Sequence, residues 1–369
     1  MKETEIKNIK YITIIATHNC NLNCSYCYEQ HKSTEKMDVD LVKKIIQNEL
    51  NIDDNFDLVA IDFFGGEPFL EFDSIINIID FVKAQKHKKE FSFFAGTNGT
   101  ILSEKYKQWL VDNKNIFSLA LSLNGTKTMQ DINRSNSFDL IDIDFFVNKF
   151  SNVTVKMTIS QDTLEYLAEG VEFLHKSGFQ FINCNLAMGV DWLNENNSFT
   201  LENELEKLIN FYLENPLLAP CSLLNYNIQN IAYYSKKIAH KYCGAGTRMK
   251  IYDIDGKVYP CQYFMPLAIG EKLLATENIV FSDIIKSSDL DTMCQKCIVV
   301  DICPSCYGSN FAGTGNIYGR DPAFCKLSKI IIKANSYFKA KQWELGLLSL
   351  DEYQEQELLK GIMMIQEQL

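Results

Sequence analysis

The chain has 369 residues, of which 46% are hydrophobic and 22% are charged, and its formal net charge is −11. This length allows one large domain and a smaller one, and the acidic balance argues against nucleic-acid binding, which needs a basic face. The N-terminal apolar run is too short for a signal peptide or a membrane span. We therefore expect a cytoplasmic protein with no membrane partner, in which the twelve cysteines are better explained as metal ligands than as disulfides.

Six β-like runs alternate with amphipathic stretches in the first half of the chain. The runs are rich in β-branched and aromatic residues, which favour buried strands; they are 11–17, 58–64, 91–97, 117–123, 153–159 and 181–188. Helices are predicted between them, near 39–50, 72–85, 104–112, 140–150 and 166–177. This alternation predicts an α/β fold with a parallel sheet and right-handed crossovers. Local propensity does not distinguish a partial barrel from an open doubly wound sheet.

The alternation stops after Met188. Two helices are predicted next, at 201–214 and 228–241, and a hairpin is predicted at Asp255-Gly256, because Asp-Gly between two β-like runs is a strong turn signal. Helices at 326–347 and 350–368 end the chain. We divide it into a barrel, a helical bridge, a cysteine-rich domain and C-terminal helices; the boundaries are 1–190, 191–242, 243–328 and 329–369.

Cys20, Cys24 and Cys27 lie within eight residues, directly after the first predicted strand. A closed zinc site uses four protein ligands, whereas three thiolates can hold a 4Fe–4S cluster on three corners and leave one iron open. The alternative is a zinc loop completed by His18 or by a distant ligand. The spacing favours the cluster.

This spacing, with Tyr26 before the third cysteine, resembles the signature of the radical S-adenosylmethionine (radical SAM) enzymes. In that family the open iron binds SAM, which is cleaved to a 5′-deoxyadenosyl radical. The resemblance implies a partial (β/α)6 barrel, catalytic roles for the three cysteines, and a SAM site at the strand ends, where barrels carry their functional groups. The implied SAM-site residues are Tyr26, Gly65, Gly66, Glu67, Asn98, Ser122, Arg134, Leu186 and Met188.

Each of these assignments has a plainer alternative. Gly65-Gly66-Glu67-Pro68 is also an ordinary turn signal. Arg134 matches a carboxylate bidentately, but it is also readable as a surface arginine, and Leu186 and Met188 as core residues. The family often has Asp where this chain has Asn124, which reduces the weight on a role for that position.

Seven later cysteines resemble the SPASM extension of radical SAM peptide-modifying enzymes, which holds two auxiliary 4Fe–4S clusters and would bring the total to three. The resemblance implies a far set of four ligands and a near set of three; these are Cys294, Cys297, Cys303 and Cys325, and Cys243, Cys261 and Cys306. Zinc is the alternative, because paired CxxC motifs commonly bind it. Met249 stands where sulfatase maturases have a further cysteine, so the near cluster either has an open iron or is completed by Cys221. Cys184 is expected in the core.

The expected chemistry follows from two departures from the sulfatase maturases. Gln262 stands where they have an aspartate base, and the near set lacks its fourth ligand. Both departures favour a maturase that joins a cysteine sulfur to a carbon of a ribosomal peptide, as in sactipeptide and ranthipeptide biosynthesis. Oxidation of a Cys or Ser side chain and other radical peptide modifications are alternatives. An electron-transfer iron–sulfur protein would leave the SAM motifs without a purpose.

The partners implied are a cysteine-containing peptide and an electron donor of the flavodoxin or ferredoxin type. About ten residues precede the first predicted strand, so we expect no N-terminal leader-binding domain. A leader peptide would then dock elsewhere, or through a separate leader-binding protein.

Overall fold

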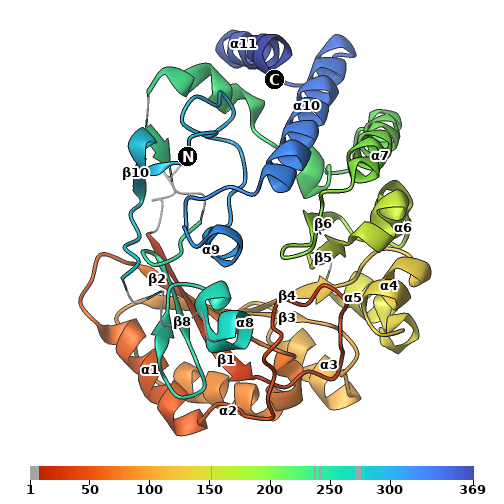
Figure 1. The fold of residues 1–369 in the computed structure, drawn as a ribbon. Helices are drawn as coiled ribbons and strands as arrows, with labels where there is room; N and C mark the ends of the chain where they lie inside the picture. Colours follow the sequence, from red (N-terminus) through yellow and green to blue (C-terminus); the bar gives the residue numbers. More distant parts are fainter. Residues whose placement is uncertain (1–7, 151, 237, 241–242, 271–275, 277) are drawn as a thin grey trace.

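The computed structural model describes residues 8–150, 152–236, 238–240, 243–270, 276 and 278–369. Six strands of its N-terminal half are consecutive neighbours in one sheet and run parallel to one another. They are β1 (Ile9–Thr17), β2 (Leu58–Gly65), β3 (Glu90–Thr97), β4 (Phe117–Ser122), β5 (Thr154–Ile159) and β6 (Phe181–Leu186). A doubly wound sheet would change direction at a switch point, so the uninterrupted order identifies the expected partial barrel (Figure 1).

Helices connect these strands and cover the outer face of the sheet (Figure 1). They are α1 (Val39–Asn51), α2 (Phe72–Lys83), α3 (Glu104–Asp112), α4 (Lys127–Asn133), α5 (Ile143–Lys149) and α6 (Leu167–Lys176). Their starts follow the capping rule that an acidic or hydroxyl side chain accepts the first free N–H groups; Asp38 does this for α1 and Ser103 for α3. Helix α4 was not predicted. It begins after Thr126, whose side chain accepts the N–H of Met129.

The two faces of the sheet differ in chemistry. Successive side chains of a strand point to opposite faces. On β2, Ile61 and Phe63 are fully buried in the main core beneath the helices, whereas Asp62 between them points to the inner side and is half-buried. Lys156 on β5 shares this inner side with Phe94 on β3, and its Nζ lies 5.2 Å from the centre of that ring. The inner side of the barrel therefore carries charge, and the outer side is apolar.

The chain crosses to its second half through α7 (Glu195–Glu214). It then returns to the first strand, because β8 (Met249–Tyr252) pairs parallel with β1 and β9 (Val258–Tyr259) pairs antiparallel with β8. The turn between β8 and β9 contains Asp255-Gly256, which confirms the predicted hairpin. Gly256 has a φ of 81°, a conformation that favours glycine.

The helix predicted at 228–241 was wrong. Residues Ile228–Lys236 form a 3-10 helix, η5, and Ile238–His240 form β7, which pairs antiparallel with β10 (Ile284–Lys286). Lys237 and Lys241, which also belong to the predicted range, lie outside the described residues. The partner strand is more than forty residues away, so the local pattern carried no signal for it.

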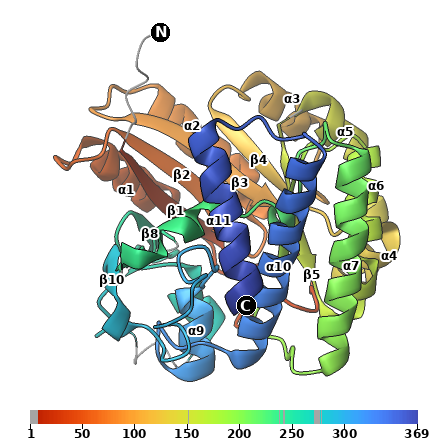
Figure 2. The same ribbon diagram turned by 90° about the horizontal axis from the view of Figure 1, so that it is seen from above.

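Short helices α8 (Pro266–Ile269) and α9 (Tyr307–Thr314) lie in the cysteine-rich region. The predicted terminal helices are present as α10 (Pro322–Glu344) and α11 (Glu352–Gln368), and Figure 2 shows α7, α10 and α11 side by side. Helix α11 packs closely on η5, since a side chain at Gly361 would come 2.5 Å from the carbonyl oxygen of Ile228. None of the described helices is long and apolar enough to cross a membrane.

Candidate functional site

The loop that carries Cys20, Cys24 and Cys27 follows the carboxyl end of β1, and each of the three cysteines is half-exposed. Gly66 lies directly against this loop. A Cβ atom at Gly66 would come 2.2 Å from the carbonyl oxygen of Asn19 and 2.9 Å from the Cβ of Cys20. The contact requires glycine, so the turn after β2 is part of the cysteine loop's support.

Glu67 joins the ends of β2 and β3 behind the cysteine loop. Its buried carboxylate accepts the Thr97 hydroxyl at 2.8 Å and the Asn98 N–H at 2.8 Å. Burial raises the pKa of Glu67, and these hydrogen bonds lower it in part. The Asn98 side chain in turn donates to the side-chain oxygen of Asn21 in the cysteine loop at 2.8 Å. The predicted residues at 66, 67 and 98 therefore meet at one place.

Arg134, at the end of α4, provides the strongest sign of a ligand. The centre of its guanidinium lies 5.6 Å from the centre of the Tyr26 ring. Its Nε is buried and has no hydrogen-bond partner among the residues that the structure describes. Buried donors are rarely left unpaired, and a carboxylate is the group a guanidinium binds best. The orphaned donor beside the cysteine loop therefore fits the carboxylate of a bound SAM molecule.

Asn124 has a role that the sequence did not reveal. Its side-chain amide donates to the Tyr26 hydroxyl at 2.8 Å, and its side-chain oxygen accepts the Thr158 N–H at 3.1 Å. Asn124 therefore fixes the tyrosine of the cysteine loop to β5. Because the amide donates to the Tyr26 oxygen, the hydroxyl proton stays available to another acceptor, whereas an aspartate would have to accept that proton itself.

The remaining predicted SAM-site residues lie at strand ends with different surroundings. Gly65 ends β2 with a φ of 123°, and Ser122 ends β4, half-buried. Leu186 is 5% exposed and belongs to the main core, which agrees with the alternative interpretation of Leu186 as a core residue. Met188 follows β6 by two residues and is half-buried.

His18 is occupied elsewhere. Its Nε2 lies 2.7 Å from Asp253 Oδ1, and its Nδ1 lies 3.3 Å from the Ser33 hydroxyl. The hydrogen bond with Asp253 raises the pKa of His18. His18 therefore connects the cysteine loop to the segment after β8. Because both ring nitrogens already have hydrogen-bond partners, His18 is not free to be the fourth ligand of a zinc ion in this loop.

The later cysteines interact electrostatically within each of the two groups that the family resemblance implied. Burial first, and then the neighbouring thiols of Cys306 and Cys243, raise the pKa of Cys261 to about 12. Burial also raises the pKa of Cys294 to about 11; Arg320 opposes this shift, and the other three members of the far set, Cys303, Cys325 and Cys297, add to it. Within each group, the charges of the thiols affect one another's pKa values.

Arg320 is a residue of the far set that sequence reasoning missed. It is 7% exposed, and its Nη2 donates to the sulfur of Cys303 at 2.8 Å. A buried guanidinium needs negative charge nearby, which four thiolates would supply. Seventeen residues separate Arg320 from Cys303, so no local motif links them.

Cys221 does not lie with the near set. It is fully buried in the main core, where its thiol hydrogen-bonds with that of Cys184. Its backbone N–H donates to the Tyr212 hydroxyl at 2.8 Å. Cys184 is a core residue, as expected, and the near set keeps three cysteines.

A stacked tyrosine pair connects the first cysteine loop to the near set. Tyr28 follows Cys27, Tyr263 follows Cys261 by two residues, and their rings stack with centres 4.2 Å apart and planes 17° apart. A side chain at Gly308, just after Cys306, would come 2.1 Å from the Cβ of Tyr263. The two cysteine sites are therefore joined by direct packing.

In the described part of the chain, no three His, Cys, Asp or Glu side chains are grouped as closely as a single metal ion requires. The fit to iron–sulfur clusters therefore rests on the donors themselves. Soft thiolates favour such clusters, and a buried cation accompanies one set of them.

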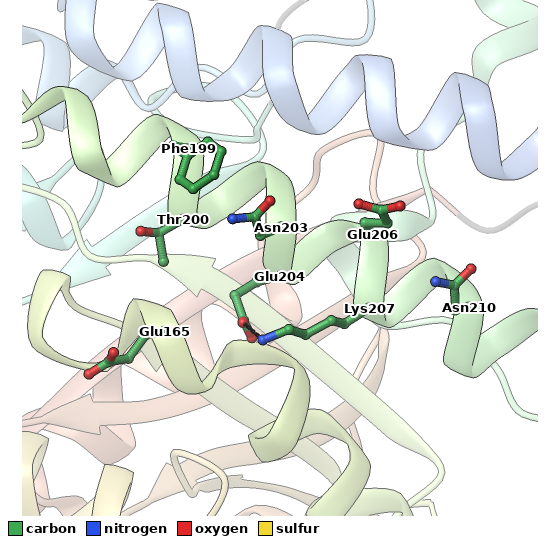
Figure 3. A pocket seen from close by; sticks show the side chains of 8 residues that line it. All are labelled: Glu165, Phe199, Thr200, Asn203, Glu204, Glu206, Lys207 and Asn210. Atoms are coloured by element: carbon green, nitrogen blue, oxygen red, sulfur yellow. Dashed lines mark hydrogen bonds and ion pairs between the residues drawn. The ribbon is translucent and has the colours of Figure 1, made fainter.

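A separate surface pocket of about 510 Å³ lies on the outer face of α7 (Figure 3). Glu204 and Lys207 form an ion pair in it, and Glu204 also accepts the N–H of Ala168 at the start of α6. Its lining contains no cysteine and consists of Glu165, Phe199, Thr200, Asn203, Glu204, Glu206, Lys207 and Asn210. This pocket is distinct from the cysteine sites.

Comparison with known proteins matches residues 11–136 to the family profile described as a 4Fe-4S single cluster domain. The chain is 25% identical to the cysteine-type anaerobic sulfatase-maturating enzyme of Clostridium novyi, over 89% of this chain and 96% of that enzyme. It is 24% identical to the radical SAM cyclopropyl synthase TigE of Paramaledivibacter caminithermalis, over 89% of this chain and 74% of that protein. An uncharacterized protein of Methanocaldococcus jannaschii is 28% identical over 49% of this chain, and the match spans 64% of its length.

A solved structure shares the fold. Native anSMEcpe with bound AdoMet and the Cp18Cys peptide matches with a TM-score of 0.70 and 17% sequence identity, over 92% of this chain and 99% of that chain. Three features together define an iron–sulfur enzyme of the radical SAM class. They are the partial barrel, the three-cysteine loop and the later sets of cysteines. The relatives make the likeness more specific: the chain resembles radical SAM enzymes such as the sulfatase-maturating enzyme and the cyclopropyl synthase, each of which aligns with 89% of this chain. The thiolate donors fit 4Fe–4S clusters, and the unpaired Nε of Arg134 fits the carboxylate of SAM.

Proposed function

We propose that this enzyme installs a thioether crosslink between a cysteine sulfur and a carbon atom of a ribosomal peptide. The observation that carries the proposal is the composition of the near set. Its fourth candidate ligand, Cys221, hydrogen-bonds with Cys184 in the core, so Cys243, Cys261 and Cys306 are left as three donors. Three cysteines hold a four-iron cluster with one iron open, and an open iron can bind the thiolate of a substrate.

The residues around the cysteine loop support SAM binding in this proposal. Cys20, Cys24 and Cys27 would hold the first cluster, and the unpaired Nε of Arg134 would bind the SAM carboxylate. When bound, SAM supplies the radical that removes a hydrogen atom from the substrate. The chain's own contribution is to hold the cysteine loop through Gly66, Glu67 and Asn124, and to orient the peptide between the two sites.

A peptide substrate is supported by the relatives. The anSMEcpe structure contains AdoMet and a peptide, and its fold matches nearly the whole of this chain. We propose three 4Fe–4S clusters in total and a donor of the flavodoxin or ferredoxin type for the reducing electron. A separate leader-binding protein would recruit the substrate.

Oxidation of a Cys or Ser side chain is the second candidate, because the sulfatase-maturating enzyme of Clostridium novyi aligns over 89% of this chain. Gln262 argues against it. The residue directly follows Cys261 of the near set, and a glutamine amide cannot accept a proton usefully at neutral pH. A thioether-forming enzyme that keeps the substrate sulfur is the better match to this site.

The proposal is tested with anaerobically reconstituted protein, dithionite, SAM and a cysteine-containing peptide encoded beside the gene. Thioether formation removes two hydrogens from the peptide and leaves the sulfur unable to react with an alkylating agent. The variant Cys306→Ala should still release 5′-deoxyadenosine but make no crosslink. A product that has lost two hydrogens and still alkylates at its cysteine would refute the thioether, and a product that has lost its sulfur would favour the oxidation.

A further inference from the structure

Asp62 carries one buried carboxylate oxygen without a partner on the inner side of the barrel. This oxygen, Oδ1, is shielded from solvent and accepts no hydrogen bond from any residue that the structure describes. The neighbours of Asp62 across the sheet are Thr13 on β1 and Phe94 on β3. A buried oxygen without a donor is costly, so its presence at this position needs a reason.

Lys156 on β5 is the charged group that acts on Asp62. Burial raises the pKa of Asp62 to about 7, and the charge of Lys156 opposes this shift. The two side chains attract each other, yet no direct ion pair joins them in the described part of the chain. The Nζ of Lys156 lies over the Phe94 ring instead, and a Cβ at Gly96 would come 3.4 Å from it. The carboxylate oxygen is therefore left available to a third group.

The position of the pair connects it to the SAM site. Lys156 is directly opposite Ser122, one of the predicted SAM-site residues, in the register of β4 and β5. Asp62 precedes Gly65 by three residues on β2, which is about 10 Å along a strand. Asp62 therefore lies on the inner side of the barrel, below the rim that carries the cysteine loop.

We propose that Asp62 accepts the proton of the substrate thiol during crosslinking, a step that rests on the proposed function. One C–H bond and one S–H bond break, and one C–S bond forms. The SAM-derived radical would take the hydrogen atom and an auxiliary iron–sulfur cluster would take one electron, while Asp62 takes the proton.

The chemistry of Asp62 suits this role. A general base works best when its pKa lies near the working pH, and Asp62 meets that condition because it is desolvated. A free cysteine thiol has a pKa of about 8.5, so transfer to a carboxylate of pKa about 7 is only slightly uphill. Gln262 offers no such acceptor.

The test compares Asp62→Asn with Asp62→Glu and with Asp80→Asn, a matched control that removes an exposed carboxylate from the outer face of α2. With a peptide deuterated at the reacting carbon, Asp62→Asn should still transfer deuterium to 5′-deoxyadenosine and bind the peptide within about twofold of wild type. Thioether formation should fall by about 100-fold, the range of general-base catalysis. Asp62→Glu should restore part of it, and Asp80→Asn should match wild type.

Two further readouts separate this role from a structural one. Wild-type crosslinking should fall as the pH drops below about 7, whereas Asp62→Asn should lack that dependence. In the absence of SAM and peptide, Asp62→Asn should raise the melting temperature at pH 8, because it removes an unpaired buried charge. Unchanged crosslinking in Asp62→Asn, or loss of peptide binding and deuterium transfer, would overturn the inference. Failure of wild type to form any thioether would instead refute the proposed function.

Discussion

The most informative substitution is Arg134→Met, because Arg134 combines a buried unpaired donor with a position beside the cysteine loop. A hydrogen bond to a charged group contributes about 1.5–3 kcal/mol. At about 1.4 kcal/mol per tenfold in affinity, loss of the carboxylate contact should weaken SAM binding by about 10- to 140-fold. Arg134→Lys should lie between, since lysine keeps the charge and loses the bidentate geometry.

The same substitution should not destabilise the ligand-free protein. Methionine removes the contact with the Tyr26 ring, which is worth about 0.5–1 kcal/mol, but it also removes the cost of the unpaired Nε, about 1–3 kcal/mol. These effects have opposite signs and the second is at least as large, so the free energy of unfolding should be unchanged or rise by up to about 2.5 kcal/mol.

Equilibrium dialysis with radiolabelled SAM measures the affinity, and thermal unfolding without SAM measures the stability. Lys127→Met on the same helix is the matched control, because the exposed Lys127 pairs with Asp131 and Asp139 and lies over the Phe138 ring rather than beside the cysteine loop. It should bind SAM as wild type does. An affinity of Arg134→Met within about threefold of wild type would refute the assignment of Arg134 to the SAM carboxylate.

Three more predictions concern other contacts. Gly66→Ala should displace the cysteine loop, because the added Cβ would lie 2.2 Å from the carbonyl oxygen of Asn19. Iron analysis should then show the loss of about one of the three proposed clusters. A full iron content would contradict this. Arg320→Met should lower the potential of the far cluster by on the order of 50 mV, as followed by electron paramagnetic resonance; an unchanged potential would exclude the role of its bond to Cys303. Asp253 raises the pKa of His18, so the stability that this pair contributes is complete below pH of about 6.5 and is lost as the pH rises through the raised value. Urea unfolding should show this loss in wild type and its absence in Asp253→Asn; equal pH profiles would contradict it.

Much of the fold was readable because its signals are local. Six apolar runs separated by amphipathic stretches predicted the strands of the barrel, and Asp255-Gly256 predicted the hairpin of β8 and β9. The division of the later cysteines into two ligand sets came from the family resemblance and stays a prediction. The error at 228–241 arose where the structure depends on a distant strand, since β7 forms only because β10 pairs with it.

The residues of the site could be predicted from the sequence only where they belong to a recognisable motif. Arg134 was found through its place in a family pattern, but its unpaired Nε depends on packing that no spacing encodes. Asp62 and Lys156 stand in ordinary strand sequences, and only closure of the sheet brings their charges to the same interior. Asn124 was undervalued because a departure from a pattern says nothing about the hydrogen bonds that replace the usual ones.

The central claim is that the enzyme joins a substrate sulfur to a substrate carbon. High-resolution mass spectrometry of the peptide product, before and after treatment with an alkylating agent, tests it most directly. The account predicts the loss of two hydrogens for each crosslink, with the sulfur retained and unreactive towards the agent. A product whose cysteine still alkylates, or has lost its sulfur, would contradict it.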